Sequence, residues 1–153
     1  MRCRQISNEA ELLEIIKRCQ WCHMAMVDPG GNPYLLPMNF GYRDGVIYLH
    51  GADQGKKISV LEHNPSVCIN FSADQLLRFQ SEDVACSYTM KYRSVLVYGK
   101  AEFITEAEEK IAALNIIMSQ YSDKAFKFNL PSVREVKVWK IKADKIEGRA
   151  LGY

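Results

Sequence analysis

The segment Tyr48-Leu49-His50-Gly51-Ala52-Asp53-Gln54-Gly55-Lys56-Lys57-Ile58 joins the end of an apolar strand, a loop of small residues and the start of a helix. Backbone N–H groups at a helix start lack intrahelical partners, and the helix dipole adds partial positive charge there. Gly51 and Gly55 let an anion approach the main chain, and Lys56 and Lys57 add full charges. The segment therefore predicts a phosphate site. The alternative is a strand-to-helix connection whose lysines are only solvated.

This segment is not a nucleotide-binding P-loop. That motif places four residues between its first glycine and Gly-Lys, and it needs Ser or Thr after the lysine to hold magnesium. Here three residues separate Gly51 from Gly55, and Lys57 occupies the position of the hydroxyl. The sequence therefore argues against an ATPase.

The flanking sequence predicts a mainly β protein. Apolar runs bounded by turn formers predict strands at 23–27, 34–42, 46–50, 66–72, 92–104 and 136–146. Capping-box patterns at 8–11 and 105–108 begin two amphipathic helices, and a shorter helix from Lys56 ends before Asn64-Pro65. The polar stretch 73–83 predicts an exposed excursion, and Gly99 predicts a bulge. The expected class is α+β, with antiparallel strands in a small closed or partly closed barrel.

Length and composition narrow the classes of function. The 153 residues suit a single domain, 1–153, with an ordinary globular composition of 48% hydrophobic and 25% charged residues. A net charge of +2, spread along the chain, gives no indication of nucleic-acid binding. The N-terminus lacks an apolar signal and no segment is long enough to span a bilayer, so we expect a cytoplasmic protein whose five cysteines are reduced.

One cysteine motif suggests other chemistry. The stretch Cys19-Gln20-Trp21-Cys22-His23 matches the CxxCH pattern of c-type haem attachment. Covalent attachment of that haem takes place outside the cytoplasm, and no export signal is present. A zinc site would need a second pair of ligands, and the three histidines are scattered. We therefore expect no metal site and assign these cysteines to the core.

Five segments resemble, in order, the FMN-binding split barrels related to pyridoxamine 5'-phosphate oxidase, and among them the nitroimidazole-resistance (Nim-type) proteins. They are residues 31–40 (GNPYLLPMNF), 47–57 (IYLHGADQGKK), 64–68 (NPSVC), 92–101 (YRSVLVYGKA) and 139–149, which begins Trp-Lys-Ile and ends Glu-Gly-Arg. The resemblance covers most of the chain. It implies an antiparallel split β-barrel.

The resemblance also implies a homodimer with flavin at the subunit interface, either FMN or FAD. Lys56 and Lys57 would hold the flavin phosphate, and Ser94 would make a polar contact to the ring. Trp139 of the partner chain would pack over the site. The other residues expected at the flavin are Met38, Asn39 and Phe40, through their backbone, and Leu49, His50 and Gly51 from the next strand.

The function implied is a flavin-dependent oxidoreductase that passes electrons from NAD(P)H to nitroaromatic compounds of the 5-nitroimidazole type. His50 would act as the catalytic proton donor, because the pKa of histidine lies near neutrality. One alternative is a flavin or haem carrier without turnover, in which His23 or His50 ligates haem iron. Another is a plain dimeric barrel with a solvated lysine loop. A pyridoxamine phosphate oxidase is disfavoured, because the chain lacks that enzyme's basic C-terminal motif.

Overall fold

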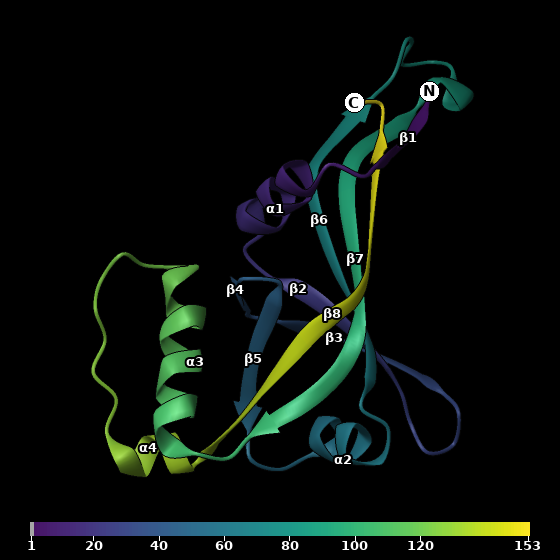
Figure 1. Cartoon of the computed structure of the whole chain (residues 1–153). Coiled ribbons are helices and arrows are strands. Elements are labelled where there is room, and N and C mark those ends of the chain that lie inside the picture. The colour runs from purple at the N-terminus through teal and green to yellow at the C-terminus, as the bar shows by residue number, and fades with distance from the viewer. Residues whose placement is uncertain (1) are drawn as a thin grey trace.

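The computed structural model describes residues 2–153, which form an eight-stranded antiparallel sheet flanked by helices (Figure 1). The strands are β1 (Cys3–Ile6), β2 (Cys22–Val27), β3 (Pro33–Met38), β4 (Gly41–Arg43), β5 (Val46–Ala52), β6 (Ser66–Arg78), β7 (Thr89–Ile104) and β8 (Val136–Leu151). The helices are α1 (Glu9–Arg18), α2 (Lys56–His63), α3 (Ala107–Ser119), α4 (Leu130–Arg134) and the short 3-10 helix η1 (Ala85–Ser87). None of the helices within residues 2–153 is long and apolar enough to cross a membrane.

The sheet curls into a barrel that is split between two edge regions. Its strand order is β3-β2-β6-β7-β8-β5-β4, with β1 paired to the far end of β8. The strands β3 and β4 end this order and are not hydrogen-bonded to each other, so the barrel stays open on the side where β3 faces β4 and β5. The antiparallel split barrel predicted from the sequence is therefore confirmed.

The predicted bulge at Gly99 is confirmed and has a steric cause. The register between β7 and β8 shifts between Tyr98 and Gly99. A Cβ atom at Gly99 would lie 2.5 Å from the backbone oxygen of Lys142, so only glycine fits where the two long strands bend past each other.

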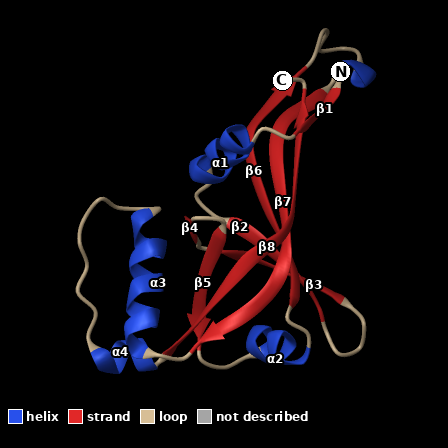
Figure 2. Cartoon of the chain, in the orientation of Figure 1, coloured by secondary structure: helices blue, strands red, loops and turns tan. Residues whose placement is uncertain are grey.

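The helices lie against the sheet (Figure 2), and two clusters of apolar side chains hold them there. The larger fills the barrel and includes the buried face of α1, whose cap is confirmed: the Asn8 side chain accepts a hydrogen bond from the Glu11 N–H at 3.0 Å. The smaller joins α3 and α4 to the outer side of β5, β7 and β8 through Leu114, Ile117 and Val138 among others. The second predicted capping box is wrong, because the cap of α3 is Glu106 and its side chain makes no capping bond.

Two predicted boundaries change, and one strand was not predicted. The strand expected over 34–42 is divided into β3 and β4, because the Phe40 N–H donates to the Tyr121 hydroxyl at 2.9 Å instead of joining the ladder. The N-terminal strand β1 was not predicted. The strand expected over 66–72 continues to Arg78, so much of the predicted excursion is a hairpin extension of β6 and β7.

Gly41 sets how closely α3 approaches the barrel. A Cβ atom there would lie 2.6 Å from the backbone of Ile117, which cannot move without displacing the helix. We expect Gly41→Ala to lower the free energy of unfolding by about 1–3 kcal/mol, as overpacking does, measured by urea denaturation. Gly30→Ala is the control, since its Cβ would meet the movable side-chain ends of Asn32 and Asp28. Equal stability of the two variants would contradict this packing.

Candidate functional site

The lysine segment forms the expected strand, loop and helix at one end of the barrel (Figure 1). Strand β5 ends at Ala52, and α2 starts at Lys56 after Gly55, whose φ of 114° favours glycine. The carbonyl of Gly55 accepts the N–H groups of Ile58 and Ser59, and no side chain among the described residues caps the helix. The N–H groups of the first turn thus face the loop as the sequence predicts.

Lys57 lies at the split of the barrel. Its Nζ is 3.7 Å from Met38 Sδ on β3 and 5.5 Å from the ring centre of Trp139 on β8. A Cβ atom at Gly51 would lie 2.6 Å from this Nζ, so the bare backbone of β5 makes room for the ammonium group. Burial lowers the pKa of Lys57 from its ordinary value. None of the ion pairs among the described residues includes Lys57. A half-buried ammonium group without a carboxylate beside it favours the binding of an anion.

Lys56 takes a different direction although it is the next residue. Its side chain is exposed, and its Nζ lies 4.4 Å from the centre of the Tyr34 ring on β3. The two lysines are therefore not equivalent. Lys57 reaches over the barrel opening, whereas Lys56 lies on the rim, where water screens its charge.

His50 and Leu49 occupy opposite faces of β5. Leu49 is completely buried in the barrel, whereas His50 is half-buried on the outer side, where it pairs with Val138 of β8. His50 Nδ1 is buried and has no hydrogen-bond partner. Burial, and to a lesser extent the charge of Lys57, lower the pKa of His50. An unpartnered buried nitrogen is costly, so His50 Nδ1 is a position where a ligand or a water molecule would be stabilised.

Trp139 corrects one expectation. Its side chain is completely buried within its own subunit, between Leu49 and Phe103 in the register, so the prediction that it packs over a partner's site is wrong. The indole instead forms the floor beneath Gly51 and Lys57. Its Nε1 is a second buried nitrogen without a partner.

The backbone predicted to lie beside the flavin ring is only partly free. Met38 is buried and contacts Lys57, and Phe40 is buried against Phe71 with the ring centres 4.8 Å apart. The Phe40 N–H already donates to the Tyr121 hydroxyl, a contact between residues far apart in the sequence that local patterns do not reveal. Asn39 is exposed beside a surface hollow of about 430 Å³ that Trp21 also lines.

The structure does not bring Ser94 to Lys57. Ser94 is partly exposed on the outer face of β7, whereas Met38 faces the inside of the barrel. The strand order places β7 three strands from β3, which is about 14 Å at the usual strand spacing. One subunit therefore unites Met38, Gly51, Lys57 and Trp139, with His50 on the other side of β5.

Comparisons with known proteins agree with this architecture. The family model described as pyridoxamine 5'-phosphate oxidase matches residues 8–150. A candidate 5-nitroimidazole antibiotic resistance protein from Bacteroides thetaiotaomicron is 40% identical, with a TM-score of 0.88 over 97% of this chain and 87% of that protein. No functionally curated protein matches the sequence.

Two more distant structures share the fold alone. The flavocytochrome Anf3 from Azotobacter vinelandii is 19% identical, with a TM-score of 0.81 over 99% of this chain and 70% of that one. The FAD and haem binding protein from Mycobacterium smegmatis is 15% identical, with a TM-score of 0.85 over 97% of this chain and 74% of that one.

The family match spans nearly the whole chain, and the 40% identical structure has the same barrel, so this chain belongs to the pyridoxamine 5'-phosphate oxidase family.

Proposed function

We propose that this protein is a flavin-dependent oxidoreductase that works as a homodimer, with NAD(P)H as electron donor and nitroaromatic compounds of the 5-nitroimidazole type as acceptors. The observation that carries the proposal is the half-buried ammonium group of Lys57 at the barrel split, with His50 beside it on β5. The 40% identical protein, named for 5-nitroimidazole resistance, supports this choice of acceptor.

The residues at the split suit a flavin. A flavin mononucleotide has a flat apolar ring and one phosphate, and it needs an apolar wall with a cation at one end. Lys57 and the first turn of α2 supply the cationic end, and Met38 and Leu49 lie on the two strands that border the split. His50 Nδ1 and Trp139 Nε1 are buried polar atoms that still lack partners. An FAD would bind by the same phosphate contact.

The protein's own groups have separable roles in this proposal. A bound flavin would supply two-electron chemistry, between a nicotinamide donor and the acceptor. Lys57 would bind the phosphate, and the lowered pKa of its ammonium group would return toward the ordinary value beside that anion. His50 would deliver a proton to the reduced acceptor from its imidazolium form, which burial and the charge of Lys57 disfavour and which a bound phosphate that neutralises Lys57 would favour again.

Lys57→Met tests the phosphate contact while keeping the apolar stem of the side chain. A charge-assisted contact is worth about 1.5–3 kcal/mol, so the Kd for FMN should rise by about tenfold or more, measured by quenching of flavin fluorescence. Lys142→Met removes the same charge from the exposed middle of β8 and should leave the Kd unchanged. If both variants bind FMN as the wild type does, the assignment of Lys57 is wrong.

The lowered pKa of His50 predicts a pH dependence of stability. As pH falls below about 6.5, histidine in the unfolded chain gains its proton before His50 in the folded chain does, so the folded state loses stability. The free energy of unfolding of His50→Gln should therefore fall less steeply with decreasing pH than that of the wild type. The two slopes should differ by up to about 1.4 kcal/mol per pH unit. Denaturant unfolding between neutral and acidic pH measures both slopes, and His23 and His63, present in both proteins, cancel. Identical slopes would show that the pKa of His50 is not lowered.

Turnover is tested on the purified protein by visible spectroscopy under anaerobic conditions. We expect flavin absorbance bands that bleach with NAD(P)H and return only after a 5-nitroimidazole is added. A flavin that binds but stays oxidised with both NADH and NADPH would contradict the proposed reductase and favour the carrier. A Soret band would identify haem, as in the two more distant structures named for haem or cytochrome.

A further inference from the structure

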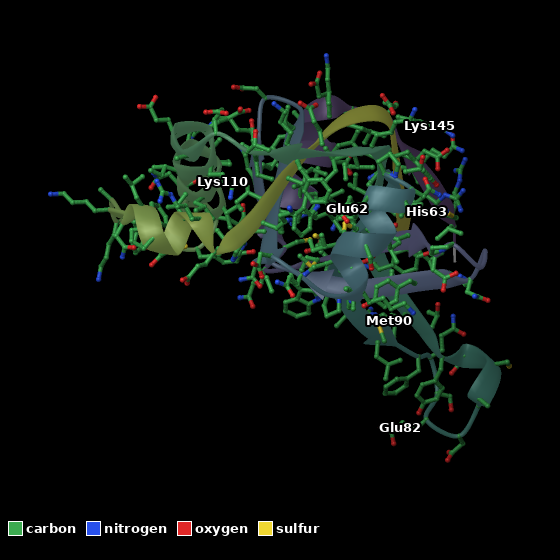
Figure 3. The ribbon with its side chains drawn as sticks, turned by 90° about the horizontal axis from the view of Figure 1, so that it is seen from below. Glu62, His63, Glu82, Met90, Lys110 and Lys145 are labelled. Atoms are coloured by element: carbon green, nitrogen blue, oxygen red, sulfur yellow. The ribbon has the colours of Figure 1, made fainter. Side chains whose placement is uncertain are left out.

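We propose that the surface hollow beside Trp21 binds the adenosine phosphate part of a nucleotide. The hollow, of about 430 Å³, lies where the end of α1 and the start of β2 meet the end of α3. A second hollow of about 330 Å³ shares the segment 18–21 with it and extends along β6 at 72–75. Beyond this point the hairpin of β6 and β7 projects away from the barrel, at Glu82 and Met90, so the hollows lie on the body of the chain (Figure 3). The inference goes beyond the proposed function, because it concerns a second site.

Trp21 is an exposed indole that lines both hollows. Its side chain is 54% exposed, although Cys19 and Cys22 on either side of it in the sequence are buried. Within the described part of the chain, its ring stacks on no other aromatic ring. A flat, exposed aromatic face is the surface on which a nucleic-acid base stacks, whichever base it is.

Hydrogen bonds from the end of α3 fix the walls of the hollow. Gln120 Nε2 donates to the carbonyls of Lys17 and Cys19, both at 2.9 Å, and so ties the end of α1 to α3. The Tyr121 hydroxyl accepts the Phe40 N–H at 2.9 Å, which leaves its own proton for a ligand. Burial raises the pKa of Tyr121, so that proton is retained at neutral pH. Walls held in place before binding lower the cost of ordering a ligand.

Two carboxamide side chains at the hollow favour adenine. Gln20 and Asn39 are exposed, and neither side chain forms a hydrogen bond within the described part of the chain. A carboxamide presents a donor and an acceptor together, which match the N6 and N7 edge of adenine. Guanine is read most often by arginine, but the Arg18 guanidinium already contacts Asp74 at 3.0 Å and the Glu14 carbonyl at 3.2 Å. The free groups therefore suit adenine better than guanine.

Lys17 supplies a charge for the phosphate. Its ammonium group lies 3.7 Å from the carboxylate of Glu14 on the same helix, and the two side chains are 61% and 66% exposed. A surface pair of this kind contributes little, so the lysine can exchange the carboxylate for a phosphate at little cost. Among the described residues that line the 430 Å³ hollow, none carries a carboxylate, and Lys17 and Arg18 are cations. An anionic ligand is therefore favoured over a neutral one.

The hollow adjoins the candidate flavin site through the end of β3. Asn39, at the hollow, directly follows Met38, whose Sδ lies 3.7 Å from Lys57 Nζ. Cys22, which follows Trp21, pairs with Met38 in the sheet. Adenosine phosphate is a part of both FAD and NAD(P)H, whereas FMN has no adenosine. Both dinucleotides are therefore candidate sources of the adenosine.

Binding of AMP to the purified full-length protein tests the site by isothermal titration calorimetry. We expect Trp21→Leu to raise the Kd for AMP on the order of tenfold, through loss of one stacking contact. Trp21→Phe keeps an aromatic ring and should restore most of the affinity. AMP should also quench tryptophan fluorescence in the wild type but not in Trp21→Phe, because the other tryptophan, Trp139, is completely buried.

The phosphate contact is tested by comparing AMP with adenosine. Lys17→Met should raise the Kd for AMP about fivefold or more and leave the Kd for adenosine unchanged, since adenosine has no phosphate. Lys145→Met is the control, because Lys145 is 65% exposed and is also paired with a glutamate, Glu147, but lies on β8 and lines neither hollow. It should leave both Kd values unchanged.

Unaltered AMP binding by Trp21→Leu would overturn the inference. So would a wild type that binds no AMP at millimolar concentration, or one that binds GMP as tightly as AMP. Asn39→Ala gives the same comparison if circular dichroism shows that Trp21→Leu is unfolded, because it removes a carboxamide from the same hollow.

The two sources of adenosine are separated with the same variant. A loss of FAD affinity in Trp21→Leu, with FMN binding unchanged, would assign the site to the cofactor. A loss of NADP⁺ affinity, with both flavins unchanged, would assign it to the electron donor, and either result supports the inference. None of these affinities depends on turnover, so a protein that binds AMP but reduces no nitro compound would refute the proposed function and leave this site intact.

Discussion

The missing side chain at Gly51 determines how the candidate site is built. A methyl group there would overlap Lys57 Nζ, so the ammonium group lies at the barrel split only because β5 presents bare backbone at that position. The indole of Trp139 supports the same space from below, and Met38 limits it from β3. The site thus depends on a contact between two edges of the sheet that are not hydrogen-bonded to each other, and α2 holds the lysine between them.

Strand β5 separates two kinds of environment. Leu49, on its inner face, is fully buried in the barrel, whereas His50, on its outer face, is only half-buried. Lys57 and His50 are close enough for the charge of one to lower the pKa of the other. An anion beside Lys57 would offset the charge that lowers the pKa of His50, whereas the unpartnered His50 Nδ1, on the outer face of β5, favours a hydrogen-bonding group there.

Local features of the chain were predictable from the sequence. The cap at Asn8, the bulge at Gly99 and the helix start at Lys56 all follow from residues within one turn or one strand pair. The break between β3 and β4 does not, because it depends on the hydroxyl of Tyr121, far along the chain from Phe40. Local patterns cannot reveal that a backbone N–H is bound by a distant side chain.

The candidate site shows the same limit. The sequence predicts Gly51 and Lys57 as neighbours because only five residues separate them, and the structure brings them into contact. The resemblance to a family supplied Ser94 and Trp139 without saying which face of the sheet each occupies. That depends on strand register, and a shift of one residue reverses every side chain. Trp139 is accordingly in the core of its own subunit, and Ser94 faces outward.

The hairpin formed by the outer ends of β6 and β7 shows why a polar sequence can hide an apolar surface. Residues 73–83 predict an exposed excursion, because charged residues outnumber apolar ones between Gln80 and Asp83 and no long apolar run is present. In a hairpin, however, every second residue shares a face, so Leu77 and Phe79 meet Met90 and Tyr88 from the returning strand. This apolar row forms only after the chain has folded back. An exposed apolar row assembled from two segments in this way buries little surface within the chain, so it adds little to the hydrophobic stabilisation of the fold.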